Sequence, residues 1–334
     1  MIRTLCLASG ALLAASCSVP SADTSESANM AGAPDEVKIV PASMQTGPEP
    51  TPTVDDTPQV PPAPAEPANC DAGLAKQGGL LLCENGEPGT VIRMNGEPVA
   101  KFDASGRAAI GLAQAAPLKV TLSIPQPDGD TVSKTVTLAE REDFYAELSM
   151  KCNQIDARTD AEKAHAARAW KWKQAAFAEF HDGSGFHPGV TRPAEGVTSS
   201  PFGPTRKYSG VDETTGEVCE KTSVHRGYDI ATPVGTPLIA PADGIITLAD
   251  ELYYEGNAIF LDHGQGLVSI FMHLSEMDVA EGDVIKRGDV IGKTGNTGRT
   301  TGPHLHWSVK WRNTASDDRN DDFYIDPALI LEAG

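Results

Sequence analysis

Half of the chain's eight histidines lie in three short segments whose side chains could bind a metal ion. Side chains alternate between the two faces of a β-strand, so His304 and His306 share one face and Leu305 and Trp307 share the other. A histidine pair on one face of a strand is a suitable start for a metal site, because imidazole nitrogen is a good zinc ligand.

The segment 225–229 supplies two further ligand-type side chains. His225 and Asp229 share a face if this segment is extended, and Gly227 between them removes a side chain where a metal ion or a substrate would approach. A catalytic zinc keeps three protein ligands and one open position. With His273, His304 and His306 there are five candidate side chains, two more than the three ligands that a catalytic zinc needs. The two additional groups could act in general acid–base catalysis.

At these positions the sequence resembles the lysostaphin/LytM family of zinc metallopeptidases, which hydrolyse peptidoglycan. The resemblance spans roughly residues 196–334. Its motifs are H-x-G-x-D from His225 to Asp229, an aromatic-x-H-L segment at 271–274, and TGPHLH followed by an aromatic residue at 301–307. Further matching stretches are residues 200–203 with Arg206, 235–237, 240–244, 262–264, 282–283, 288–292 and 326–327.

The resemblance implies a role for each candidate residue. In the family, the first His, the Asp and the second His of H-x-H bind zinc, which here are His225, Asp229 and His306, with one Zn²⁺ per chain. The strand histidine and the first His of H-x-H flank the catalytic water, which implies catalytic roles for His273 and His304. An insertion at about residues 207–224 precedes the first ligand. Because of it, the resemblance does not predict the shape of one wall of the groove above the metal.

Charge and the N-terminus bear on partners and location. The 334-residue chain has a formal net charge of -19, which argues against nucleic acid as a partner because phosphate binding needs basic surface. Residues 1–17 are typical of an export signal ending in a lipoprotein-type box, with Cys17 as the lipidated residue; the alternative is an ordinary cleaved signal. Ser18 favours an outer-membrane lipoprotein that faces the periplasm, and otherwise the protein is expected to be soluble in the periplasm.

The chain is predicted to be mostly β, with a compact antiparallel LytM-type domain at residues 196–334. Residues 18–68 form a tether that holds eleven of the 25 prolines and stays unfolded. Residues 69–152 read as a small β-sandwich-like domain, with hairpin turns at Asn95–Gly96 and at residues 128–130. Residues 153–195 form a helical connector.

Four cysteines remain after the signal: Cys70, Cys83, Cys152 and Cys219. An oxidising compartment favours disulfides. Four cysteines allow three pairings, and the sequence does not choose among them.

The connector contains one clear helix, over residues 159–180. Residues 159–162 form a capping box, and Ala166, Trp170, Phe177 and Phe180 recur at helical spacing. Trp170 is expected to pack against a neighbouring domain rather than to stack on a sugar, whereas Trp172 is more open to either role.

The candidate residues predict metal-dependent hydrolysis, and the resemblance implies the substrate: a zinc-dependent endopeptidase that cleaves the peptide cross-links of peptidoglycan. One alternative is a non-catalytic LytM-type activator of a cell-wall amidase. Another is a wall-binding module with a structural zinc, which would need four protein ligands. His165, His181, His187 and His263 are interpreted as packing or surface residues.

Overall fold

The computed structural model describes residues 66–71 and 75–333. The predicted signal, Cys17 and residues 18–65 of the tether lie outside the described residues. In the described part of the chain, every helix is too short or too polar to cross a membrane.

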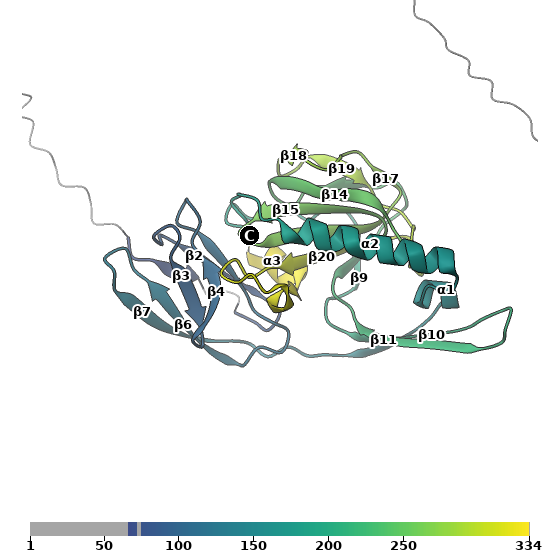
Figure 1. Ribbon diagram of the computed structural model, residues 1–334, viewed down its shortest axis with the longest axis horizontal. Coiled ribbons are helices and arrows are strands. Elements are labelled where there is room, and N and C mark those ends of the chain that lie inside the picture. Colours follow the sequence, from purple (N-terminus) through teal and green to yellow (C-terminus); the bar gives the residue numbers. More distant parts are fainter. Residues whose placement is uncertain (1–65, 72–74, 334) are drawn as a thin grey trace, which may run out of the picture. The chain divides into compact units, whose positions relative to one another are not determined.

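The largest sheet of the described residues has eight strands, and its neighbouring strands are all antiparallel. Figure 1 labels several strands of this central sheet. The strand order is β18-β14-β15-β16-β20-β12-β9, and β21 also pairs with β20. The strands are β9 (Val197–Ser200), β12 (Tyr228–Ala231), β14 (Gly244–Leu252), β15 (Gly256–Gly264), β16 (Leu267–Leu274), β18 (Val284–Ile285), β20 (His304–Trp311) and β21 (Phe323–Ile325).

Strand β20 carries the H-x-H motif and has the two faces that alternation predicts. Leu305, Trp307 and Val309 are fully buried in the core, so His304 and His306 are left on the opposite face. Trp307 also donates a hydrogen bond from Nε1 to Ser269 Oγ on β16 at 3.2 Å. The apolar face therefore anchors the strand that presents both histidines.

Smaller elements surround this sheet. The strands β13 (Pro237–Ile239), β17 (Glu276–Met277) and β19 (Val290–Lys293) form a three-stranded sheet in the order β13-β19-β17. A 3-10 turn, η1 (Arg319–Asp321), precedes β21, and helix α3 (Pro327–Ala333) follows it. The described part of residues 196–334 thus has the mostly antiparallel β-fold that was predicted.

Residues 69–138 form two small sheets whose buried side chains belong to one hydrophobic core, as the predicted sandwich requires. One sheet has the order β1-β2-β5 and the other β4-β3-β6-β7. The strands are β1 (Asn69–Asp71), β2 (Leu80–Glu84), β3 (Val91–Met94), β4 (Glu97–Lys101), β5 (Ala108–Gly111), β6 (Lys119–Pro125) and β7 (Thr131–Thr137). The two predicted hairpin turns connect β3 to β4 and β6 to β7, and a disulfide joins Cys70 to Cys83.

The insertion at residues 207–224 belongs to a β-hairpin of β10 (Thr205–Val211) and β11 (Val218–Val224). Strand β8 (Tyr145–Ser149) pairs in parallel with β10. The second disulfide links Cys152, in the short helix α1 (Cys152–Ile155), to Cys219 in β11. This hairpin is therefore clamped to the chain segment that precedes the connector.

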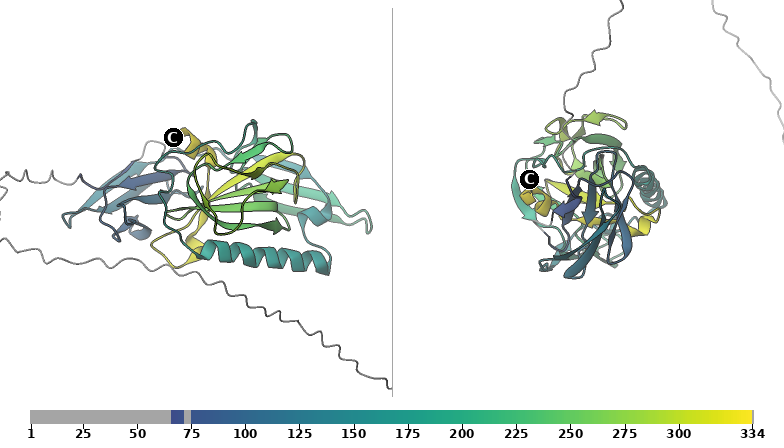
Figure 2. Two further views of the ribbon diagram at one scale, coloured as in Figure 1. Left: turned by 90° about the horizontal axis from the view of Figure 1, so that it is seen from above. Right: turned by 90° about the vertical axis from the view of Figure 1, so that its left-hand side faces the viewer.

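Helix α2 (Asp160–Ala178) begins as predicted, because Thr159 and Glu162 form the capping box. It lies along one side of the central sheet (Figure 2), where Ala169, Ala176 and Phe177 pack with residues of β14 to β16. The prediction that Trp170 packs is wrong: its side chain is 61% exposed. The buried stripe passes through Ala169, one position earlier, and Trp172 is the tryptophan that packs against this cluster.

Candidate metal centre and groove

Three of the predicted ligands converge on one point. Asp229 Oδ1 lies 2.8 Å from His306 Nδ1 and 3.1 Å from His225 Nε2, and the two histidine nitrogens are 3.1 Å apart. The strand register places Asp229 of β12 directly opposite His306 of β20. His225 lies between β11 and β12, outside any strand, so it reaches the cluster from the segment that joins these two strands.

In the rings of His225 and His306, the nitrogen that points away from the cluster makes a hydrogen bond, and this bond determines which nitrogen carries the proton. His225 Nδ1 lies 2.7 Å from the carbonyl oxygen of Pro201, and a carbonyl only accepts, so Nδ1 carries the proton and Nε2 presents a lone pair. His306 Nε2 lies 2.9 Å from Ser308 Oγ, which can accept in the same way. Such outer hydrogen bonds commonly orient metal-binding imidazoles.

This donor set fits a divalent metal ion. Two nitrogen lone pairs and a carboxylate oxygen that face one another repel, and a cation between them removes the repulsion. Ligand atoms around a tetrahedral zinc, with bonds of about 2.0–2.1 Å, lie about 3.3 Å apart. The observed separations of 2.8 to 3.1 Å are close to that value.

Arg206 holds the second oxygen of Asp229. Its Nη2 donates to Asp229 Oδ2 at 2.8 Å and to Ser200 Oγ at 2.7 Å. Burial by itself would raise the pKa of Asp229, but its side-chain contacts with His225 and His306 hold that pKa well below its usual range. Arg206 was noted in the sequence only as part of a motif, and its role in orienting a ligand was missed.

The absence of a side chain at Gly227 makes room for the ring of His306. The expectation that it makes room for a metal ion or a substrate is wrong. A Cβ at this position would lie 2.3 Å from His306 Nε2 and 2.8 Å from Ser308 Oγ. The glycine is thus required because the His306 ring and its hydrogen-bond partner occupy the space beside the backbone.

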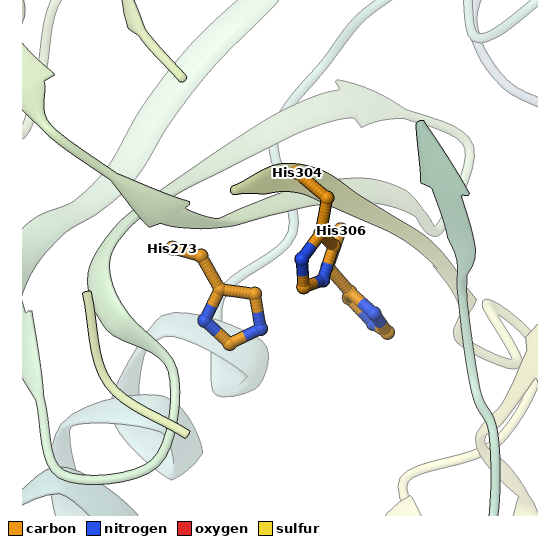
Figure 3. Close-up of side chains that lie close together, drawn as sticks. All are labelled: His273, His304 and His306. Carbon is orange, nitrogen blue, oxygen red and sulfur yellow. The ribbon is translucent and has the colours of Figure 1, made fainter. Parts of the chain in front are cut away.

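The two predicted catalytic histidines lie beside the candidate metal ligands. The rings of His273 and His304 have centroids 4.9 Å apart, and Figure 3 shows both near His306. His304 Nδ1 donates to the carbonyl of Gly302 and His273 Nδ1 to that of Thr297, both at 2.8 Å, so both Nε2 atoms are free of a proton. A second possible metal-binding group, His273 with His304 and His306, shares the His306 ring.

Both of these histidines stay neutral around pH 7. Burial lowers the pKa of His273 to about 3, and the neighbouring His304 and His306 act in the same direction. Burial also lowers the pKa of His304, although Asp229 opposes this effect. A neutral imidazole with an unprotonated Nε2 can accept a proton from a reacting group.

A backbone distortion turns His273 toward the ligands. Met272 pairs with His306 across β16 and β20, so its side chain shares the face of His306, and regular alternation would point His273 into the core. His273 instead has a φ of 66°, in the left-handed region that non-glycine residues seldom adopt. Strain of this kind is common at functional sites, and strand periodicity alone does not reveal it.

A groove of about 750 Å³ is lined by all five site residues. Its walls also include residues from outside the central sheet: Leu148 of β8, Trp170 and Lys173 of α2, and Tyr208 of β10. Segments outside the central sheet therefore shape the space above the candidate metal ligands.

The remaining histidines lie away from this groove. His263 is fully buried, with Nδ1 donating to the carbonyl of Asp243 and Nε2 accepting from Ser269 Oγ. Burial lowers the pKa of His263 to about 4. His165, His181 and His187 contact Glu251, Asp262 and Glu84 respectively, which agrees with packing or surface roles.

A β-sheet that presents a His–Asp–His cluster and two neutral histidines in a groove defines a metallopeptidase-type domain. Residues 223–318 match the model of peptidase family M23. The chain therefore carries an M23 peptidase domain, and the resemblance to the LytM-type peptidases is confirmed.

Individual relatives cover this domain. Peptidoglycan DD-endopeptidase ShyA of Vibrio cholerae is 37% identical over 111 residues, which are 33% of this chain and 24% of that protein. DD-carboxypeptidase/endopeptidase Mpg of Neisseria meningitidis is 46% identical over 87 residues, which are 26% of this chain and 20% of that protein. The match thus spans about a quarter or less of the length of these relatives.

One solved structure extends the similarity beyond the domain. A crystal structure of a candidate peptidase M23 from Pseudomonas aeruginosa has a TM-score of 0.52 and 28% identity. The match covers 78% of this chain and 96% of that one, so it includes part of the region that precedes the central sheet.

Proposed function

We propose that this protein is a zinc-dependent endopeptidase that hydrolyses peptide cross-links of peptidoglycan. The observation that carries the proposal is the convergence of His225 Nε2, Asp229 Oδ1 and His306 Nδ1 at about 3 Å from one another. Relatives of the domain are named peptidoglycan DD-endopeptidases, which supports the substrate class.

Each site residue has a separate task in this proposal. Bound zinc supplies Lewis acidity and lowers the pKa of water from about 16 to about 7. His225, Asp229 and His306 would hold it, and Arg206 keeps Asp229 oriented through Oδ2. His304 Nε2 accepts the proton of the attacking water, and later delivers it to the leaving amine.

His273 completes the arrangement from the opposite side. Its Nδ1–H bond to Thr297 fixes the ring, so that Nε2 faces the groove. There its unprotonated Nε2 can accept a hydrogen bond from the attacking water and so orient it. The chain needs no serine or cysteine nucleophile for this reaction.

The two alternatives receive less support. The non-catalytic activator is disfavoured because the full set of ligands and both additional histidines are present and correctly oriented. A structural zinc would need a fourth protein ligand. His304 is the obvious candidate, because its Nε2 lies 3.7 Å from Asp229 Oδ1, so the retention or loss of zinc in a His304 variant distinguishes the catalytic site from the structural one.

The substrate determines where the protein works. Peptidoglycan lies outside the cytoplasmic membrane, so we propose that the protein is exported and acts at the cell wall. Lipidation of Cys17 and residence in the outer membrane remain predictions for a part of the chain that the structure does not describe.

Digestion of purified sacculi tests the proposed function. The soluble chain that begins at Ala22 should convert cross-linked muropeptides to monomers, as measured by mass spectrometry, and a chelator should abolish this activity. His304→Ala should retain zinc but lose turnover. Zinc loss in His304→Ala would favour the structural site, and intact sacculi with one equivalent of zinc bound to the unaltered protein would favour the activator.

A further inference from the structure

The groove is cationic although the protein as a whole is strongly acidic. Its charged lining, other than histidine, consists of four cations and two carboxylates: Lys173, Arg206, Arg226, Arg299, Asp229 and Glu255. Both carboxylates are already paired, Asp229 with Arg206 at 2.8 Å and Glu255 with Lys173 at 2.5 Å. Two arginines therefore remain in a chain whose formal net charge is -19.

Arg299 is held in place by aromatic rings. Its guanidinium lies 5.2 Å from the ring centre of Tyr208 and 4.9 Å from that of Tyr254, and its backbone N–H donates to the carbonyl of Tyr254. Within the residues that the structure describes, it makes no ion pair. Stacking on rings leaves the N–H groups at the edge of a guanidinium available to a ligand.

Arg226 occupies a comparable position next to the first metal ligand. Its guanidinium lies 5.6 Å from the ring centre of Tyr324, and its side chain is exposed. No acidic side chain of the described chain lies within ion-pair distance of it. Arg226 also lines a second hollow, together with Trp170 and Lys310, that shares several residues with the main groove.

We propose that Arg226 and Arg299 form a carboxylate-binding subsite that selects acidic peptides for the groove. This inference rests on the proposed function, because it specifies which peptides reach the catalytic residues. The planar fork of a guanidinium matches the two oxygens of a carboxylate. Arg226 follows ligand His225 and Arg299 lies shortly before His304, so both can contact a chain that lies across the metal ligands.

Peptide binding to a catalytically inactive protein tests the subsite. The probe is a pair of synthetic peptides of one sequence, with either free carboxylates or the corresponding amides. They are titrated into the zinc-loaded His304→Ala protein, with Trp170 fluorescence and calorimetry as readouts. Charge-assisted hydrogen bonds predict that the acid form binds about tenfold more tightly or better.

Variants of the two arginines then test whether these residues cause the preference for the acid peptide. Arg226→Gln and Arg299→Gln, each in the His304→Ala background, should reduce the preference for the acid form, and the double variant should remove it. Arg226→Lys and Arg299→Lys should retain part of it, because the charge remains. Arg93→Gln, on β3 outside the groove, should leave it unchanged, and thermal melting checks that each variant is folded.

Equal binding of the acid and amide peptides, or a preference that survives in the double glutamine variant, would overturn the subsite. Failure of the proposed function looks different. In that case sacculi stay intact with the active protein, whereas the acid peptide still binds through the two arginines.

Discussion

At Asp229 both carboxylate oxygens have a defined task. Oδ1 faces His225 and His306, and Oδ2 accepts a hydrogen bond from Arg206. In the proposed metal centre, the orientation of Asp229 thus depends on Arg206, which is not one of the proposed ligands. Residue types and spacing predicted five candidate site residues, and the family resemblance predicted which three of them bind the metal. The supporting contacts were not predicted, because they join positions far apart in the sequence.

Loss of Arg206 should weaken metal binding. Arg206→Gln frees Asp229 Oδ2 and should lower zinc affinity about 10- to 100-fold, which is typical for the loss of a group that orients a ligand. Competition with a fluorescent chelator measures the affinity. Lys207→Gln, the next residue of β10, is the matched control and should bind zinc as before; equal affinity in both variants would exclude the role of Arg206.

Gly227 should not tolerate a side chain. In Gly227→Ala the new Cβ would collide with His306 Nε2 at 2.3 Å, so the ring must move and zinc affinity should fall at least tenfold. Gly302→Ala is the control, because a Cβ there meets no atom within 4 Å. The same chelator competition distinguishes them, and normal zinc binding by Gly227→Ala would contradict the packing account.

His263 should make stability depend on pH. Its folded pKa of about 4 lies below the ordinary value of 6.5, so the unfolded chain binds the proton first as the pH falls. Stability should therefore decrease from about pH 6.5 to about pH 4, by about 3 kcal/mol in total. His263→Gln keeps one donor and one acceptor but does not titrate.

Urea unfolding at pH 7 and pH 4.5 checks this prediction. The loss of stability between the two pH values should be smaller in His263→Gln than in the parent protein. An equal loss in both proteins would mean that His263 does not contribute to the acid sensitivity.

At the scale of elements, the two faces of β20 were predicted correctly and the buried face of one helix was not. Leu305 and Trp307 alternate with two histidines, so the faces of β20 follow directly from its sequence. On α2, apolar residues occur on more than one face, and spacing could not tell Trp170 from the stripe through Ala169 and Phe177. The φ of 66° at His273 is likewise set by tertiary structure.

The disulfide between Cys152 and Cys219 should support the site through the β10–β11 hairpin, which carries Arg206. Its loop of 67 residues, against 13 for Cys70–Cys83, predicts stabilisation of about 4 and about 3 kcal/mol respectively. Replacing Cys152 and Cys219 by serine should lower both the melting temperature and zinc affinity.

The other disulfide provides the control. Replacing Cys70 and Cys83 by serine should lower the melting temperature, but it should leave zinc affinity nearly unchanged, because that bridge lies between β1 and β2. Equal effects of the two replacements on zinc affinity would show that the hairpin does not position Arg206.

At the scale of the whole molecule, the groove is built from more than the family domain. The family match covers residues 223–318, yet Leu148, Trp170 and Tyr208 also line the groove. The sequence motifs identified the candidate site residues within the domain. They could not show that β8, α2 and an inserted hairpin complete the walls, because those contacts arise only when the chain has folded.

The central claim is that His225, Asp229 and His306 hold one catalytic zinc ion. Anomalous diffraction at the zinc absorption edge, from crystals of the soluble chain, tests it most directly. We predict a single peak at about 2.0–2.2 Å from His225 Nε2, Asp229 Oδ1 and His306 Nδ1, with His273 and His304 outside bonding distance. A peak bound by His273 and His304, or none at these residues in protein that carries one equivalent of zinc, would contradict the account.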